Sequence, residues 1–366
     1  MQSARLVFLI ALAAAARGAD DPAAFRARLL AAATGHLDQL LGAGLKGKSS
    51  AAMTAWAYYL TYELTGDRRY KAAGVELADR VLRQMKATKF GVLYIKPKTR
   101  ENGREIPGGG PPALGWYTSA LGYVFHREGG RENDLRYVAA VVDQYPWNEK
   151  GWWAAAIDVK TGESKLDMAK PSPVNKNAAL AMSAALLGNY LEDLDAALSA
   201  RLKHKARRCI YNQIIPAQEA DGYWHYGLNG NDPKEKDVLG YHMLTASFLA
   251  QLRLLDPSYR EPRLDAAMNK AGAFARTCIA PITGRSRGTG CPQRSTPGTP
   301  AHFDLAETPK RGFELAVNLF ATGNSDEGVR ILSEALEHFP SGDRGENGAH
   351  AARPVAVILR MLPARP

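Results

Sequence analysis

The feature that most constrains the fold of this chain is a strict alternation between two kinds of helix. One kind is small and apolar on every side. Six segments of this kind contain only five charged residues, which are Glu63, Arg253, Glu314, Arg353 and Arg360. The other kind is amphipathic, as in RRYKAAGVELADRVLRQMK, which alone has eight charged residues. A helix that is apolar all round is buried on all sides, whereas an amphipathic helix covers it and faces water. The sequence therefore predicts an inner layer of helices wrapped by an outer layer.

Helical periodicity predicts twelve helices in total. Pro or Asp near several starts and Gly near several ends support the boundaries. The helices are expected at residues 23–42, 50–65, 68–87, 113–127, 132–145, 174–191, 195–214, 237–255, 262–279, 309–322, 324–339 and 348–362. Inner and outer helices alternate along this series, which describes six helical hairpins arranged as an all-α (α/α)6 toroid.

The lengths of the connections support the same arrangement. Connections from an inner to an outer helix are short, as at Gly66-Asp67 and Gly323, and connections back to an inner helix are mostly long. The long ones cover residues 88–112, 146–173, 215–236 and 280–308. They emerge at one end of the barrel, where long loops in a compact domain usually carry function. An open solenoid of helical hairpins is the alternative, but no repeat signature supports it.

Short strand-like runs interrupt these long loops. Residues 91–97 (GVLYIKP), 152–159 (WWAAAIDV) and 222–228 (GYWHYGL) are rich in aromatic and branched side chains. We expect them to form small β-hairpins over the mouth of the barrel.

The first eighteen residues have the pattern of a signal peptide. Arg5 gives a positive start, Leu6 to Ala16 are apolar, and small residues precede a cleavage site after Gly18. The apolar stretch is shorter than the ~20 residues of a membrane span. An uncleaved membrane anchor is the alternative. We expect residues 19–366 to form one domain without a membrane span, secreted or periplasmic.

Composition limits the classes of partner. The chain has 366 residues, 46% hydrophobic and 23% charged, and a net charge of +10 at pH 7. The excess is spread along the chain, with no basic block of the kind that binds nucleic acid. The three cysteines are too few for a disulfide scaffold, but Cys278 and Cys291 flank one loop and are candidates for a single pair. The oligomeric state does not follow from these features.

The segment DGYWHYGLNGNDPKEKDVLGYHMLTASFLAQL (221–252) is the most specific piece of the pattern. An aromatic turn followed by Tyr-His at the head of an inner helix resembles segments of the six-hairpin, or (α/α)6 toroid, superfamily of carbohydrate-active proteins. The resemblance extends over essentially the whole mature chain, but it lies in the arrangement of the helices more than in short sequence motifs. It implies action on polysaccharides, often ones that contain uronates, by lyases, hydrolases or epimerases. Fold alone does not decide between these reactions.

Histidine and tyrosine side chains supply candidates for proton transfer. His242 and Tyr241 open an inner helix, and His225 and Tyr226 lie in the aromatic loop before it. A neutral imidazole can remove a proton, and a helix N-terminus favours the neutral form. A hydrogen-bonded structural histidine is the alternative for each position.

Asn175 and Asn177 begin another inner helix, and Arg311 begins a third. Amide and guanidinium groups at a cleft can bind a substrate carboxylate and stabilise charge that develops on it. Simple N-capping is the alternative for both asparagines. In lyases of this superfamily, Asn or Arg neutralises the uronate carboxylate while His or Tyr removes the C5 proton. The resemblance implies those roles here.

The loops also carry candidate substrate-binding residues. Flat aromatic rings can pack on sugar rings, and Arg can bind carboxylate or sulfate. The candidates are Trp116, Tyr117, Trp152, Trp153, Tyr223, Trp224, Arg285 and Arg287. Aromatic plugs that fix the loops to the barrel are the alternative for the rings.

These residues favour an exported enzyme that cleaves an acidic polysaccharide by β-elimination. A glycoside hydrolase needs two carboxyl groups, for which Asp237 with Asp304 or Glu307 are the candidates. Two further interpretations fit the same fold, namely an epimerase and a non-catalytic carbohydrate-binding toroid. The sequence has no phosphate-binding loop, no GxSxG and no zinc motif, so we expect neither a cofactor nor a metal.

Overall fold

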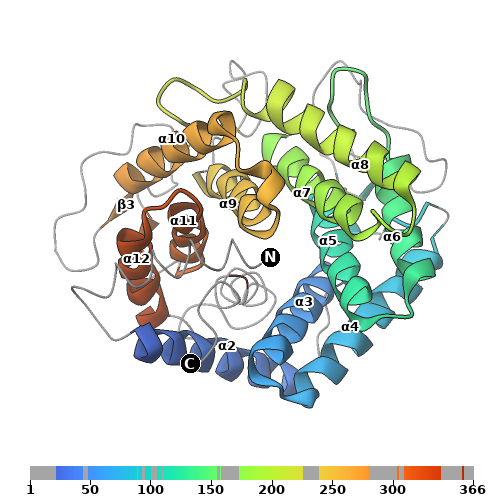
Figure 1. Ribbon diagram of the computed structural model, residues 1–366, viewed down its shortest axis with the longest axis horizontal. Helices are drawn as coiled ribbons and strands as arrows, with labels where there is room; N and C mark the ends of the chain where they lie inside the picture. The colour runs from blue at the N-terminus through green and yellow to red at the C-terminus, as the bar shows by residue number, and fades with distance from the viewer. Residues whose placement is uncertain are drawn as a thin grey trace.

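The structure, a computed structural model, consists of two concentric rings of helices (Figure 1). It describes residues 22–43, 48–88, 90–92, 95–99, 105–108, 111–154, 157, 173–225, 239–280, 303–304, 309–338 and 357. The α-helices of this part of the chain are α2 (Pro22–Ala43), α3 (Lys48–Thr65), α4 (Arg68–Lys86), α5 (Pro111–Glu128), α6 (Glu132–Gln144), α7 (Val174–Tyr190), α8 (Ala196–Cys209), α9 (Leu239–Leu255), α10 (Pro262–Cys278), α11 (Pro309–Ala321) and α12 (Ser325–His338). The predicted (α/α)6 toroid is confirmed.

The odd-numbered helices from α3 to α11 form the inner ring, and the even-numbered helices cover them (Figure 1). Burial follows the two sequence types. Nearly every residue of α7 from Val174 to Gly188 is buried, whereas α4 buries a single stripe that includes Tyr70, Leu77 and Val81. The twelfth helix was expected at residues 348–362, and of that range the structure describes only Val357, which is helical and buried. Apolar burial on both sides of the inner ring is thus the main stabilising contribution.

One hydrogen bond joins the two ends of the helical series. Arg28 of α2 donates from Nη2 to Ser333 Oγ of α12 at 3.1 Å, across 305 positions of sequence. The helices that contact each other most strongly lie close together in the chain, as α3 with α4, α5 with α7 and α11 with α12. The seam between α2 and α12 is therefore where the ring closes.

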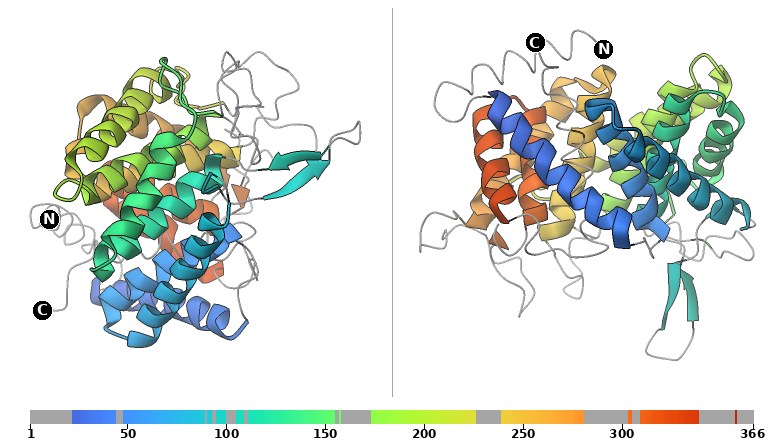
Figure 2. Two further views of the ribbon diagram at one scale, coloured as in Figure 1. Left: turned by 90° about the vertical axis from the view of Figure 1, so that its right-hand side faces the viewer. Right: turned by 90° about the horizontal axis from the view of Figure 1, so that it is seen from below.

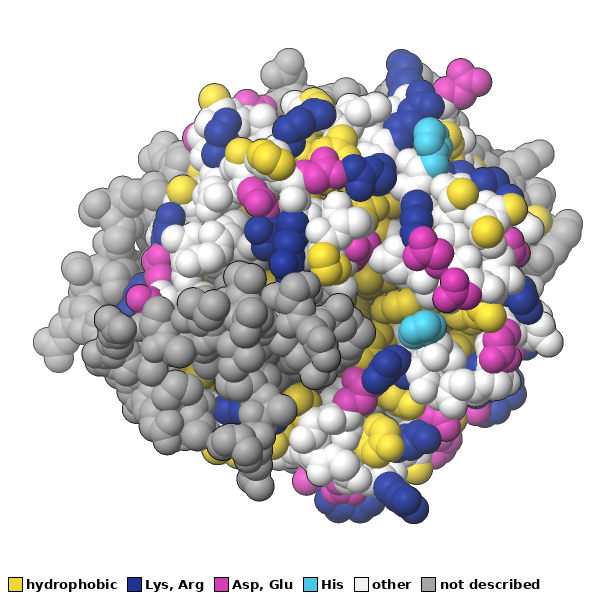
Figure 3. Space-filling model, in the orientation of Figure 1, with side chains coloured by type: hydrophobic (Ala, Val, Ile, Leu, Met, Phe, Trp, Pro, Cys, Tyr) yellow, Lys and Arg dark blue, Asp and Glu magenta, His cyan; other side chains and the backbone are white. Residues whose placement is uncertain are grey.

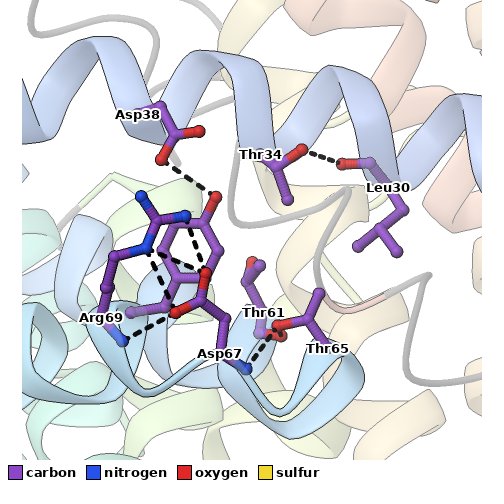
Figure 4. A network of polar contacts seen from close by, with 8 residues as sticks. Leu30, Thr34, Asp38, Thr61, Thr65, Asp67 and Arg69 are labelled. Atoms are coloured by element: carbon purple, nitrogen blue, oxygen red, sulfur yellow. Dashed lines mark hydrogen bonds and ion pairs between the residues drawn. The ribbon is translucent and has the colours of Figure 1, made fainter.

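The turn from α3 to α4 shows how a short connection is built (Figure 4). Gly66 has a φ of 76°, which a residue with a side chain rarely adopts. Asp67 then caps α4 by accepting the Arg69 amide at 2.9 Å, and the Tyr70 hydroxyl donates to Asp38 of α2 at 3.1 Å. Burial and this carboxylate raise the pKa of Tyr70 to about 12. The short inner-to-outer connection expected at Gly66-Asp67 is confirmed.

The long connections emerge at the other end of the barrel. Strands β1 (Ile95–Thr99) and β2 (Glu105–Gly108) form an antiparallel hairpin that projects from the end where the inner helices begin (Figure 2). Trp147 and Trp153 form an isolated antiparallel bridge, and the two-residue strands β3 (Ile279–Ala280) and β4 (Phe303–Asp304) pair in parallel. Residues 222–225 contain no strand, so the hairpin expected there does not appear in its described part. We call this end of the barrel the mouth.

The opposite end of the barrel, which faces the viewer in Figure 3, has acidic side chains lying beside basic ones. Glu63 at the end of α3 accepts hydrogen bonds from Tyr123 Oη at 2.5 Å and from Arg127 Nε at 2.6 Å. Arg253 near the end of α9 binds Asp265 of α10. Two of the few charges on the apolar inner helices therefore pair locally where those helices end.

Gly115 lets two inner helices approach each other closely. A Cβ at this position of α5 would lie 2.5 Å from the carbonyl carbon of Ala179 in α7 and 2.6 Å from its oxygen. Because both are backbone atoms, they can be relieved only by moving the helices apart. Gly35 of α2, in contrast, has nothing within 4 Å of the same point.

We expect Gly115→Ala to lower the free energy of unfolding by ~1–3 kcal/mol, the cost of overpacking a filled interior. Gly35→Ala should instead raise it by up to ~1 kcal/mol, because Ala is the better helix former. Urea denaturation of both variants measures the difference. Equal effects of the two substitutions would show that α5 and α7 can move apart without lowering the free energy of unfolding.

No helix of the described residues is both long and apolar enough to cross a membrane. The same part of the chain contains no group of three His, Cys, Asp or Glu side chains able to hold a metal ion.

Candidate functional site at the mouth of the barrel

The mouth collects the heads of the inner helices. Asn175 lies in the first turn of α7, Tyr241 and His242 in that of α9, and Arg311 in that of α11. His225 ends the described part of the loop that leads into α9. These positions share one end of the barrel because the inner helices run in the same direction (Figure 2). The side chain of Arg311 is outside the described part of the structure.

His242 is a buried structural residue, which corrects its assignment as the general base. Its Nδ1 accepts the backbone N–H of Trp224 at 3.1 Å, and its Nε2 lies 3.3 Å from the carbonyl oxygen of Ala271. The ring is fully buried between aromatic side chains. Burial lowers the pKa of His242 to about 4, so the imidazole is neutral with its proton on Nε2. Both ring nitrogens are occupied, and neither is open to a substrate.

Asn177 also has a structural role rather than the predicted catalytic one. Its Oδ1 accepts the backbone N–H of Trp153 at 2.9 Å and lies 3.8 Å from Sγ of Cys209, and its Nδ2 donates to the carbonyl of Pro173 at 3.3 Å. The side chain therefore fixes the loop around Trp153 onto the start of α7. Burial raises the pKa of the Cys209 thiol, which makes this cysteine unreactive.

Asn175 differs from Asn177 in how its amide oxygen is paired. The residue is 4% exposed, and within the described part of the chain no group bonds its Oδ1. The residue before α7 is Pro173, which offers no side-chain cap. A buried amide oxygen without a hydrogen bond costs ~1–3 kcal/mol, so it is able to gain from a partner supplied by a ligand or water.

Most of the predicted sugar-binding aromatics are buried, so those in the loops have the alternative role of plugs, and Tyr117 of α5 is part of the core. Tyr117, Trp152, Trp153, Tyr223 and Trp224 are all buried. The indole N–H of Trp224, for example, donates to the carbonyl of Ile214 at 2.8 Å inside the protein. Buried rings of this kind cannot present a face to a sugar.

Trp116 is the exception, because it is only partly buried. Its ring centroid lies 5.8 Å from that of Phe248. The two residues come from α5 and α9, which are separated by α7 in the ring of helices, so their rings meet across the interior of the barrel. Trp116 remains a candidate sugar platform at the mouth. Tyr241, also partly buried, remains a candidate proton donor.

His225 is paired with a carboxylate that the sequence did not single out. Its Nε2 lies 3.3 Å from Oε1 of Glu219, and its side chain is 17% exposed. The ring also makes an edge-to-face contact with Tyr223 at 5.2 Å. A histidine oriented by a carboxylate and open to solvent is a common arrangement for proton transfer. Glu219 was missed because it lies six residues before His225 in an irregular loop, where no helix or strand periodicity relates the two side chains.

Glu314 is a second residue without a role in the sequence-based prediction. It is a buried carboxyl side chain in the second turn of α11, and it is the one acidic residue of that helix. The lone acidic residue in GFELAVNLFA was the available signal.

Several predicted residues fall outside the described part of the chain. These are Tyr226, Arg285, Arg287, Asp237, Glu307, Cys291 and the whole of residues 1–18. Asp304 lies in β4, but its side chain is not described. The hydrolase pair, the disulfide and the signal peptide therefore stay predictions.

No family model matches the chain, and no curated protein matches its sequence. Solved structures do resemble it. A cellobiose 2-epimerase from Bacillus thermoamylovorans superimposes with a TM-score of 0.60 at 10% identity, covering 86% of this chain and 88% of that one. A reducing-end-xylose releasing exo-oligoxylanase gives 0.55 at 13% over 95% and 96%, and a D-mannose isomerase gives 0.53 at 14% over 86% of each chain. The chain therefore shares the (α/α)6 toroid fold of these three structures.

Proposed function

We propose that the protein is a carbohydrate-active enzyme that removes a carbon-bound proton from a sugar, with His225 as the base. The observation that carries the proposal is the His225–Glu219 pair in the loop that leads into inner helix α9. The leading reaction is β-elimination on a uronate-containing polysaccharide, without a cofactor. In this proposal the protein is exported after removal of residues 1–18.

The reaction balances with the residues at the mouth. His225 takes the C5 proton, which is acidic because it is adjacent to the uronate carboxylate. The electron pair left on C5 forms the C4–C5 double bond as the C4–O bond breaks, and Tyr241 protonates the leaving oxygen. Glu219 orients the imidazole of His225 through its contact with Nε2.

Asn175 supplies the substrate contact in this proposal. An amide side chain has an acceptor and two donors, so Oδ1 can accept a sugar hydroxyl while Nδ2 donates to a carboxylate oxygen. The absence of a partner for Oδ1 among the described residues supports this role. Arg311, at the head of the next inner helix but one, is proposed to neutralise the same carboxylate.

Epimerisation is the second candidate. It begins with the same removal of a carbon-bound proton and differs in returning a proton to the other face of the carbon. The resemblance to a cellobiose 2-epimerase and a D-mannose isomerase supports this candidate.

The purified mature protein should be tested on uronate polymers and on neutral disaccharides in deuterium oxide. Elimination gives ultraviolet absorbance from the new double bond. Epimerisation gives solvent deuterium on a sugar carbon without cleavage. New reducing ends with neither signal would indicate hydrolysis, and binding without turnover would indicate a non-catalytic toroid. Either of these last outcomes overturns proton abstraction by His225.

The two asparagines of α7 provide a matched test of the substrate contact. We expect Asn175→Ala to raise KM by ~10-fold, the loss of about one hydrogen bond to a charged group, and to leave stability unchanged or higher, because it removes an unpaired buried oxygen. Asn177→Ala should instead lower the free energy of unfolding by ~1–3 kcal/mol, because it leaves the Trp153 amide unpaired. Kinetics and urea denaturation measure both. Destabilisation by Asn175→Ala with normal KM would contradict a binding role.

A further inference from the structure

Trp224, the residue directly before His225, is held by two hydrogen bonds from different parts of the molecule. Its backbone N–H donates to Nδ1 of His242 in α9, and its indole N–H donates to the carbonyl of Ile214. Ile214 is the last residue of a π-helical turn, Ile210–Ile214, that extends α8. Carbonyls at a helix end lack partners within the helix, so this one is able to accept the indole. Trp224 thereby joins the end of an outer helix to the head of an inner one.

His242 is itself fixed from a third helix. Its Nε2–H donates to the carbonyl of Ala271 in α10 at 3.3 Å. Tyr223 stacks on its ring at 5.1 Å, and Phe274 of α10 packs edge-on at 5.2 Å. The imidazole can therefore neither tilt nor exchange its tautomer without losing one of these contacts.

The turn before Trp224 brings the carboxylate to the histidine. The Glu219 N–H donates to the carbonyl of Tyr223 at 2.9 Å, which closes the turn. Gly222 sits against α10 with a φ of 97°, and a Cβ there would lie 2.3 Å from the Lys270 carbonyl oxygen. The turn is pressed onto the helix so closely that the separation of Glu219 and His225 follows from backbone contacts.

We propose that Trp224 and His242 are positioning residues, which hold the backbone of His225 so that its imidazole pairs with Glu219 at the mouth of the barrel. The proposal rests on the proposed function only in treating His225 as the base. His242 acts through a neighbour and touches no substrate. Its fixed tautomer matters because only an unprotonated Nδ1 can accept the Trp224 amide.

The test compares two replacements of His242. Asn carries an acceptor oxygen near the place of Nδ1, so His242→Asn should keep the bond to Trp224. His242→Leu keeps the volume and removes the acceptor. His126→Asn serves as the matched control, because His126 is an exposed histidine at the opposite end of the barrel, stacked on Tyr190.

We expect the Trp224 amide to exchange with solvent at least ~10-fold faster in the Leu variant and at nearly the wild-type rate in the other two. Hydrogen exchange read by NMR measures this without any substrate. Modification of His225 by diethyl pyrocarbonate, followed by mass spectrometry, should be faster in the Leu variant alone. On an active substrate kcat should fall by about 10² in the Leu variant, with KM little changed and with recovery in the Asn variant.

The outcomes separate this proposal from the proposed function. Wild-type exchange of the Trp224 amide in the Leu variant overturns the positioning role, whatever the activity. Faster exchange with unchanged modification of His225 also overturns it, because the bond then does not reach the histidine. Altered exchange and modification in a protein without activity on any sugar support the positioning role and count against the proposed reaction.

Discussion

Replacing His225 with Ala should reduce turnover by at least ~10², the lower range for loss of a general base, while KM changes little. The reason is that the imidazole is the one partly exposed histidine at the mouth among the described residues, and its Nε2 is oriented by Glu219. Steady-state kinetics on the substrate found in the screen measures the effect.

The control for this prediction is His204→Ala. His204 is an exposed histidine on outer helix α8, where its ring contacts Trp147 at 6.4 Å. Turnover of this variant should equal that of the wild type. A folded His225→Ala variant with near-normal kcat would move the base role away from this residue, and a variant that fails to fold would give His225 a structural role instead.

The stability of the protein should decrease steeply between pH 6.5 and pH 4 because of His242. Its pKa is about 4 in the folded protein and ~6.5 in the unfolded chain, so in this interval the unfolded chain binds the additional proton. The stabilisation is complete above pH ~6.5 and is lost as the pH falls through this window. A difference of this size corresponds to ~3 kcal/mol.

Urea denaturation of the wild type and of His242→Asn across this range isolates the contribution. Carboxylates with a lowered pKa, such as Asp134 beside Lys86 and Arg131, destabilise both proteins equally as they are protonated. The difference between the two curves should therefore shrink as the pH falls from 6.5 to 4. Parallel curves would mean that His242 titrates alike in the folded and unfolded chains.

The architecture could be predicted from the sequence because it depends on features repeated along whole helices. The outer helix expected at 68–87 is found at Arg68–Lys86, and the inner helix expected at 174–191 is found at Val174–Tyr190. Errors of one or two residues in the predicted ends of a helix do not change which of its faces is buried. The end of the barrel that carries the long connections followed from the same alternation.

The chemistry of single side chains could not be predicted in this way. Asn175 and Asn177 stand two residues apart at the start of one helix, and the sequence makes them equivalent. Only the packing of the loop at Trp153 shows that the two amides differ in their bonding within the described structure. His242 similarly looked like a base at a helix head. Its two ring nitrogens are occupied by groups from α10 and from the loop at Trp224, and these contacts between distant segments do not show in the sequence.

The seam at Arg28 and Ser333 has a consequence for how the chain reaches its folded state. Because helices adjacent in the ring are mostly adjacent in sequence, most of the ring can assemble progressively through short-range contacts, which form quickly. Joining α2 to α12 spans 305 positions, so it costs more loop-closure entropy than any contact between successive helices. We therefore expect the circle to close last on folding, and the seam between α2 and α12 to be the first place where it opens.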